Sequence, residues 1–386
     1  MKAPMRARGA LYGLAIGDAL GMPTQMLSRP QIVARWGAFL TGFEPAPPGH
    51  PIAAGLPAGA VTDDTEQAVL LARLLIKGHG AVTPRELAEA LVSWERDMAA
   101  RGSLDLMGPS TKRAVAAVLG GVPPEQAGAS GDTNGAAMRI APVGIAVPLD
   151  LPQAVSSSSA VSSSAAVSSS AAVSPSSAVS PSGAVSSSAA VSPSGAVNPS
   201  DPASRSGLSA LIDQVVAASR VTHNTGIALA GAAAVAAAVS AGMSGASIAE
   251  ATAIGATAAR LAAGRGHWVA GADVAARIDW AAGLVAGRDR AEAAELIYTL
   301  VGTSLATQES VPAAFAVLAA EPEDPWQACL LAASLGGDCD TIVAMAGAVA
   351  GACHGLRAFP SGALAVIEAQ GLGLAGLADD LCALRS

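Results

Sequence analysis

Apolar residues recur at helical spacing through the second half of the chain, and this pattern restricts the fold more than any other feature. Leu208, Leu211, Ile212, Val215 and Val216 follow the i, i+3, i+4, i+7, i+8 order of one helix face. Further helices are predicted at 226–242, 247–263, 271–286, 290–304, 311–319, 325–334, 340–356 and 361–369. Much of the apolar content is alanine, the strongest helix former, whereas aromatic residues make up 3% of the chain. The chain is therefore predicted to be all-α.

A tract of Ser, Ala, Val and Pro interrupts this pattern. Within it the dipeptide Ala-Val returns every six residues, from Ala154 to Ala196. Such a sequence offers too little apolar surface to offset the entropy lost on ordering, so we favour a disordered insertion over 151–206. A stacked β-helix is the alternative for a six-residue period. Residues 1–150 and 207–386 are then expected to form one domain, from which the tract can be deleted without loss of activity.

Charge and cysteine content limit the partners. The formal net charge of −8 provides no basic face for a phosphate backbone, so nucleic acid is not expected to bind. The uncharged run after His223 is long enough to span a bilayer, but its Ala and Gly residues favour a buried helix, and no membrane partner is expected.

The chain start and the four cysteines bear on location. Lys2, Arg6 and Arg8 precede a short apolar stretch that we interpret as the first core helix rather than a signal peptide. The cysteines form no CxxC pair, so we expect reduced thiols and a cytoplasmic protein. A monomer is the working expectation, since the sequence does not determine the oligomeric state.

The first acidic motif is Thr62-Asp63-Asp64-Thr65, directly before an apolar helix. Asp63 and Glu66 have the spacing of a helix N-cap and its box partner, which is the ordinary explanation of such residues. Capping does not require Asp64 or the two threonines, however. Carboxylate and hydroxyl oxygens are the ligands that Mg²⁺ selects.

A second motif, Asp338-Cys339-Asp340-Thr341, repeats this chemistry far along the chain. Asp340 is also explained by capping of the helix that follows it. The two motifs together supply four carboxylates and several hydroxyls, enough for two octahedral ions. The sequence therefore leaves two interpretations open, a pair of helix caps or a dinuclear site.

Two further segments have polar residues at turns. Asn134-Gly135 is typical of a turn, and a glycine-flanked turn can also bind phosphate or sugar hydroxyls through its backbone N–H groups. His223 lies near a predicted helix end, where a lone histidine is more often a cap than a catalyst.

In combination these motifs resemble the ADP-ribosylglycohydrolase family, which includes DraG-like enzymes and the ADP-ribosylhydrolases. The resemblance covers nearly all of the chain outside the tract, and the segments that match it, in order, are GALYGLAIGDALGMP, VTDDTEQAV, GPSTKRAV, TNGAAMRIAPVGI, VTHNT and SLGGDCDTIVAMAGAVAGACHG.

The resemblance implies an orthogonal all-α bundle with two Mg²⁺ or Mn²⁺ ions. It places the metal ligands at Thr62, Asp63, Asp64, Asp338, Asp340 and Thr341, and catalysis at Asp63, Asp64 and Asp338. The ADP-ribose moiety is expected at Gln25, Asn134, Gly135 and His223.

One position departs from the family pattern. Gln25 stands where the family usually has a glutamate that contacts ligand and metal and that is proposed as the general base in some members. An amide is not a base near neutral pH, although it can coordinate or hydrogen-bond. The base would then be a metal-bridging aspartate or a metal-bound hydroxide.

The implied activity is hydrolysis of the ribosyl bond of an ADP-ribosylated side chain or small molecule. A nucleoside-type N-riboside hydrolase on a smaller substrate is the first alternative, and a catalytically silent, crystallin-like ADP-ribose-binding relative is the second. The clustered carboxylates argue against a silent site. Like charges repel one another, and a site without activity has no need to keep them together. The leaving group is not determined by the sequence.

Overall fold

The computed structural model of the protein describes residues 1–100, 107–149 and 202–385, so residues 151–201 of the insertion predicted over 151–206 lie outside the described residues. The helices before the tract are α1 (Ala3–Gly21), α2 (Arg29–Trp36), α3 (Asp63–Lys77), α4 (Pro84–Ala100), α5 (Pro109–Leu119), α6 (Pro124–Ala127), α7 (Gly135–Met138) and α8 (Ala141–Ala146). Those after it are α9 (Pro202–Ser219), α10 (Gly226–Met243), α11 (Ile248–Ala262), α12 (Val274–Val285), α13 (Arg290–Leu296), the π-helical turn η1 (Ile297–Val301), α14 (Thr307–Ala320), α15 (Pro325–Ala333), α16 (Cys339–His354), the 3₁₀ turn η2 (Leu356–Ala358), α17 (Ser361–Glu368) and α18 (Leu374–Ala383).

The all-α prediction is confirmed. In the described ranges, extended pairing is limited to two isolated bridges, Thr133 with Ala306 and Thr225 with His267. Most predicted helices of the second half are present within a few residues of their expected bounds. The helix predicted at 290–304 instead widens into a π-helical turn and ends at Val301, before Gly302, whose φ of +88° suits a helix end.

Two helix starts differ from the prediction, and one helix is additional. The helix expected from Leu208 begins at Pro202, so the last residues assigned to the insertion are helical. The helix expected from Val311 begins at Thr307, so Pro312 lies inside it and not in its first turn, where proline is usual. The final helix, α18, was not predicted.

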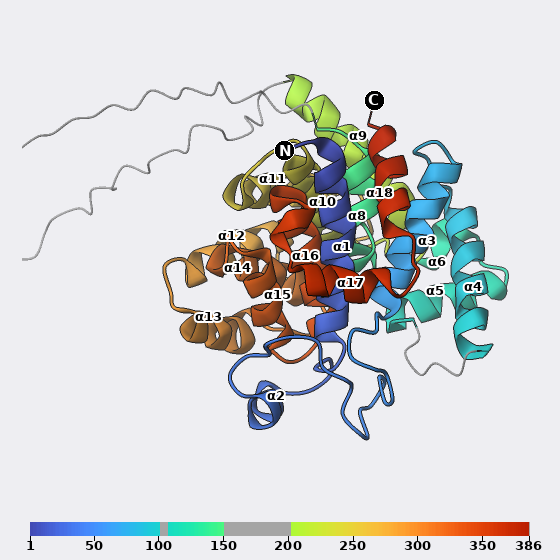
Figure 1. Ribbon diagram of the computed structural model, residues 1–386. Helices are drawn as coiled ribbons and strands as arrows, with labels where there is room; N and C mark the ends of the chain where they lie inside the picture. The colour runs from blue at the N-terminus through green and yellow to red at the C-terminus, as the bar shows by residue number, and fades with distance from the viewer. Residues whose placement is uncertain (101–106, 150–201, 386) are drawn as a thin grey trace, which may run out of the picture.

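The centre of the molecule is an antiparallel pair of helices, α1 and α16 (Figure 1). α1 has a glycine every fourth residue, so its glycines share one face. A Cβ atom at any of them would lie within 2.4 Å of the α16 backbone. The facing pairs are Gly9 with Gly351, Gly13 with Gly347, Gly17 with Val343, and Gly21 with Asp340. This contact brings the end of α1 against the start of α16.

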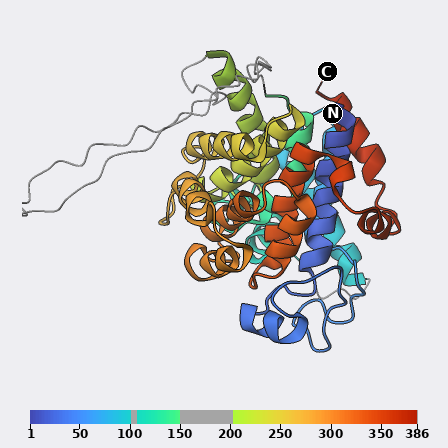
Figure 2. The ribbon, with the colours of Figure 1, turned by 60° about the vertical axis from the view of Figure 1, so that its left-hand side comes forward.

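The Ala/Gly helix α10 is a core helix, as predicted. It is long and apolar enough to cross a membrane by length and composition, but 94% of that stretch is buried inside the protein. α10 packs against α11, α16 and α8, which bury it from several sides. In Figures 1 and 2, α2 and the loop after it lie at the end of the bundle where α1 finishes.

Candidate metal centre

The two acidic motifs meet at the end of the bundle where α1 finishes and α16 begins. The first forms the beginning of α3 and the second the beginning of α16. Thr341 Oγ1 donates a hydrogen bond to Asp64 Oδ2 at 3.3 Å, across a separation of 277 residues in the chain. Asp63, Asp64, Asp338 and Asp340 are all at least nine-tenths buried. The tertiary structure thus brings together the carboxylates that the sequence placed far apart.

Helix capping does not explain these carboxylates. Thr62, not Asp63, is the N-cap of α3, and its Oγ1 accepts the Asp64 N–H at 3.4 Å. The partner expected to complete a capping box, Glu66, instead accepts a hydrogen bond from Trp94 Nε1 at 2.6 Å. At α16, the N-cap position is Asp338, whose side chain makes no capping hydrogen bond to the described helix. The cap interpretation of Asp63 and Asp340 is therefore wrong.

The first motif is anchored by Asp18, a residue of α1 that is fully buried. The Asp18 carboxylate accepts the Thr62 N–H at 2.9 Å and the Thr62 hydroxyl at 2.7 Å. It also accepts the Thr65 N–H at 3.1 Å and the Thr65 hydroxyl. Burial raises the pKa of Asp18 to about 6, although these hydrogen bonds oppose the rise. Asp18 belongs to the N-terminal segment GALYGLAIGDALGMP, but nothing in the local sequence predicts this anchoring role.

The second motif is positioned mainly by backbone. Gly336 and Gly337 precede it with φ values of +95° and +78°, a conformation that favours glycine. The Asp338 N–H donates to Thr303 O at 2.7 Å. Asn134 Nδ2 donates to Asp338 Oδ2 at 2.5 Å and to Ser310 Oγ at 2.9 Å. Asn134, predicted to bind the ligand, therefore also orients an aspartate of the cluster.

Asp64 has the most unfavourable charge environment of the cluster. Burial, followed by the negative charges of Asp340, Asp63, Asp18 and Asp338, raises the pKa of Asp64 well above its ordinary value. Its Oδ1 atom is buried without a hydrogen-bond partner. A buried carboxylate among like charges needs a cation or a proton for compensation.

This donor set fits a hard divalent cation. Carboxylate, hydroxyl and amide oxygens converge here, and the buried Asp64 oxygen without a partner is accounted for by such an ion. Among the described residues, no group of three or more His, Cys, Asp or Glu side chains is arranged to hold one ion. An ion would therefore also need hydroxyl or amide oxygens, such as those of Thr62, Thr341 and Gln25.

A cavity of about 200 Å³ opens onto the cluster. Several of the predicted site residues line it, namely Gln25, Asp63, Asn134, Gly135, Asp338, Asp340 and Thr341. Its other lining residues are Met26, Ile52, Gly108, Pro109, Thr111, Thr133, Met138 and Leu305. Gln25 is buried there, and its Nε2 atom has no hydrogen-bond partner, so the amide can donate to a ligand.

His223 lies behind this cavity rather than in its lining. The side chain is fully buried, and a Cβ atom on Gly135 would meet the imidazole ring at 2.9 Å. Burial lowers the pKa of His223 well below its ordinary value, with further lowering by Arg139 and Arg113, so the ring is neutral near pH 7. Among the residues predicted for ADP-ribose, His223 is the one that the structure separates from the cavity.

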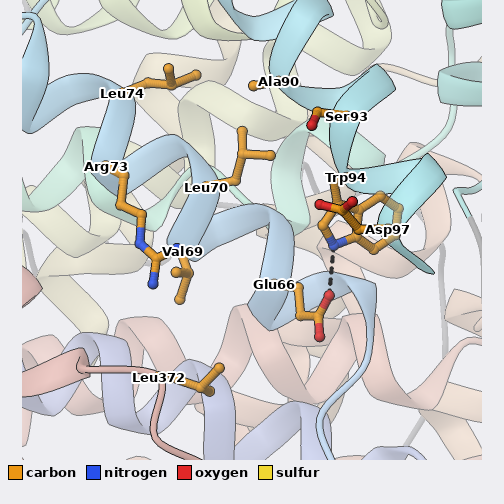
Figure 3. A pocket seen from close by; sticks show the side chains of 10 residues that line it. All are labelled: Glu66, Val69, Leu70, Arg73, Leu74, Ala90, Ser93, Trp94, Asp97 and Leu372. Atoms are coloured by element: carbon orange, nitrogen blue, oxygen red, sulfur yellow. Dashed lines mark hydrogen bonds between the residues drawn. The ribbon is translucent and has the colours of Figure 1, made fainter. Parts of the chain in front are cut away.

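A larger hollow, about 490 Å³, lies on the outer face of α3 against α4 (Figure 3). Glu66, Trp94 and Asp97 are among its lining residues, and the Trp94–Glu66 hydrogen bond crosses it. Asp63 faces the smaller cavity, whereas Glu66, three residues later, faces this hollow. Only the smaller cavity of the two adjoins the buried acidic cluster.

Comparisons with known proteins identify a family and several relatives. The family model described as ADP-ribosylglycohydrolase matches residues 2–180 and 159–386. The Escherichia coli (strain K12) protein named "Uncharacterized protein YegU" is 30% identical over 365 residues, which cover 94% of this chain and 92% of the relative. An Archaeoglobus fulgidus protein named "Uncharacterized protein" is 40% identical over 138 residues, which cover 36% of this chain and 42% of that protein.

A solved structure shares the fold. It is the "ADP-ribosylglycohydrolase-related protein complex", with a TM-score of 0.61, 22% sequence identity, and coverage of 100% of this chain and 99% of that one. The predicted all-α bundle is confirmed by this likeness.

Proposed function

Because this chain belongs to the ADP-ribosylglycohydrolase family, whose name denotes glycosidase-type hydrolases, we propose that it cleaves the ribosyl glycosidic bond of an ADP-ribosylated side chain or small molecule. The observation that carries the proposal is the junction of the two acidic motifs. Four buried aspartates lie together where Thr341 donates a hydrogen bond to Asp64, and they adjoin a cavity of about 200 Å³.

We assign this site two divalent cations, Mg²⁺ or Mn²⁺. The ligands are Thr62, Asp63 and Asp64 on α3, and Asp338, Asp340 and Thr341 on α16. When bound, such cations lower the pKa of a water molecule and neutralise the repulsion within the cluster.

The cavity side chains then have separate tasks. Gln25 Nε2, buried without a partner, donates a hydrogen bond to a ligand oxygen. Gly135 has no side chain to fill the space over His223, so the ligand can approach the backbone there. Asp338 is our candidate for the general base, since Asn134 orients its carboxylate and Gln25 cannot take a proton.

The negative charge of the cluster also suits the reaction. Glycosyl cleavage develops positive charge on the ribosyl ring, and carboxylates fixed beside the anomeric carbon stabilise that charge. The fixed orientation of Asp63, Asp64 and Asp338 means that little reorganisation is needed when the charge forms.

The test is release of free ADP-ribose from peptides ADP-ribosylated on arginine or on serine, followed by mass spectrometry with Mg²⁺ present. A chelator-treated sample and the variant Asp64→Asn are the controls. We expect release that requires both the cation and Asp64. Absence of turnover on every ADP-ribosyl and N-riboside substrate, with cation bound, would refute the proposal.

One observation favours a smaller substrate as the second candidate. The cavity is only about 200 Å³, and its described lining contains no aromatic side chain on which a base could stack. A nucleoside-type N-riboside would need less room than ADP-ribose. Thermal shift assays separate the two, because ADP-ribose should raise the melting temperature only if it binds the folded protein.

A further inference from the structure

Arg139 is a buried cation behind the cavity, between α3 and the segment after α9. Its side chain is fully buried. Nη1 donates to Gln67 Oε1 at 2.8 Å, and Nη2 donates to Thr222 Oγ1 at 2.5 Å. A guanidinium has donors and no acceptor, so both partners must accept. Arg139 therefore fixes the orientation of the Gln67 amide and occupies one of the two lone pairs of the Thr222 hydroxyl oxygen.

Two chains of hydrogen bonds start from Arg139, and each is called a branch here. The first branch runs through Gln67 to the acidic cluster. Because Gln67 Oε1 faces Arg139, its Nε2 atom must face away, and it donates to Asp63 Oδ2 at 2.8 Å. Gln67 is fully buried, so water does not compete for its amide. This branch ends on a carboxylate that lines the cavity.

The second branch passes through Thr222. Its hydroxyl has one proton. The hydroxyl can donate it to Ser219 O at 3.3 Å, and it also lies 2.7 Å from His223 Nδ1, a contact whose direction depends on the tautomer of the ring. Ser219 O already accepts the N–H groups of Thr222 and His223, at 3.0 and 2.8 Å, which occupies both of its lone pairs. Because the contact with Nδ1 is also the shorter of the two, we infer that the hydroxyl proton goes to Nδ1.

This direction determines the tautomer of His223. A neutral ring whose Nδ1 accepts must carry its proton on Nε2. Nε2 lies 3.1 Å from Thr133 Oγ1, to which it then donates. The Thr133 hydroxyl accepts this bond and retains its own proton. Thr133 lines the cavity, and within the described residues its hydroxyl has no second partner.

We propose that Arg139 is a positioning residue for ligand binding that acts on two parts of the cavity wall. Through Gln67 it holds the Asp63 carboxylate. Through Thr222 and His223 it leaves the Thr133 hydroxyl proton for an acceptor oxygen of the ligand. His223 thus contributes to binding without touching the ligand, which revises the direct contact expected from the sequence.

The identity of the ligand rests on the proposed function, whereas the direction of the hydrogen bonds does not. The first experiment therefore uses the wild-type protein without ligand. Long-range ¹H–¹⁵N NMR of the assigned His223 imidazole reports which nitrogen carries the proton. We expect protonation at Nε2. Protonation at Nδ1 would overturn the proposal, because Thr133 would then have to donate to Nε2 and would have no proton left for a ligand.

The second experiment measures ADP-ribose affinity by calorimetry with Mg²⁺ present. Thr133→Val removes the hydroxyl at similar volume, and Thr133→Ser, which keeps the hydroxyl, is the matched control. We expect Thr133→Val to weaken binding about three- to tenfold, the value of one hydrogen bond, and Thr133→Ser to stay within about twofold. Equal affinities of the two variants would overturn the proposed donation to the ligand.

Arg139→Lys tests the origin of both branches. Lysine keeps the charge, but its single ammonium nitrogen does not reproduce the planar fork that reaches Gln67 and Thr222 together. We expect the folded variant to lose the single His223 tautomer and to bind ADP-ribose at least about threefold more weakly. A folded variant with the wild-type tautomer and affinity would exclude Arg139 as the positioning residue. If the variant does not fold, the proposal is tested by the tautomer of His223 in wild-type protein and by the affinities of Thr133→Val and Thr133→Ser.

The two proposals fail in different ways. If wild-type protein neither binds ADP-ribose nor turns over a riboside, the proposed function fails, and the His223 tautomer alone still tests the hydrogen-bond direction. If hydrolysis is observed but the proton lies on Nδ1, the proposed function stands and this inference fails.

Discussion

The two acidic motifs have nearly the same residues but are held in place differently. The motif of α3 is fixed by side chains, since Asp18 accepts four hydrogen bonds from Thr62 and Thr65. The motif of α16 is fixed mainly by backbone, through two glycines with positive φ and the contact of Asp338 N–H with Thr303 O. Two motifs of nearly the same residues can therefore be held in different ways, one by a buried side chain and the other by a backbone turn.

The largest effect is expected where the two motifs touch. Asp64→Asn removes the carboxylate that accepts from Thr341, and a ligand of the proposed cations. Loss of residues that only support metal ligands costs about 10- to 100-fold, so we expect more than about 100-fold loss of hydrolysis. In metal-free protein the same change should raise the melting temperature, because it removes a buried like charge.

Glu66→Gln is the matched control for Asp64→Asn, because Glu66 lies on the same helix but faces the outer hollow. Its hydrolysis rate should stay near that of wild type. Equal losses in the two variants would show that the effect comes from α3 as a whole and not from the cluster.

The side-chain anchor is tested by Asp18→Asn. An amide offers one acceptor oxygen where the carboxylate has two, and its NH₂ group would face the donors of α3. We expect about 10- to 100-fold weaker Mg²⁺ affinity, the range for groups that orient metal ligands. Asp379→Asn is the control, since it removes only the partly exposed pair with Arg8. Unchanged Mg²⁺ affinity in Asp18→Asn would contradict the side-chain anchor.

The backbone support is tested by Gly337→Ala. A Cβ atom there would lie 2.2 Å from Thr303 O, and the φ of +78° is itself unfavourable for alanine. We expect a loss of about 1–3 kcal/mol in unfolding free energy, with weaker Mg²⁺ binding. Gly121→Ala, at a φ of +91° with nothing within 4 Å of the added atom, isolates the backbone term. If both variants lose the same stability, crowding at Thr303 has no role.

The smallest effect is a pH dependence shared by both motifs. The pKa values of Asp18 and Asp338 are each raised to about 6 by burial. A carboxyl group whose pKa is higher in the folded than in the unfolded state stabilises the folded state at low pH. This contribution is lost as pH rises from about 4 through about 6. Metal-free protein should therefore lose stability over that window, while the melting-temperature gain from Mg²⁺ should grow, because the cation binds deprotonated carboxylates. Thermal denaturation at pH 5 and pH 7.5, with and without Mg²⁺, measures both trends, and a Mg²⁺ gain that is equal at the two pH values would count against this linkage.

The sequence by itself determined the all-α class, most helix positions in the second half, and the residue types of the cluster. These follow from local information, namely apolar periodicity, alanine content and adjacent carboxylates. An aspartate is a potential metal ligand wherever it lies in the chain, so the candidate ligands could be named from the sequence.

Only the tertiary structure decided how those residues are held and which of them reach the cavity. The role of Asp18 depends on hydrogen bonds to residues 44 and 47 positions away, and that of Arg139 on partners 72 and 83 positions away. Neither separation leaves a periodic signal in the sequence. Capping of α3 by Asp63 and a place for His223 in the cavity lining were both reasonable expectations from local sequence. Packing of α1 against α16 and of Gly135 over the imidazole determined otherwise, because burial and hydrogen-bond partners are properties of the folded chain.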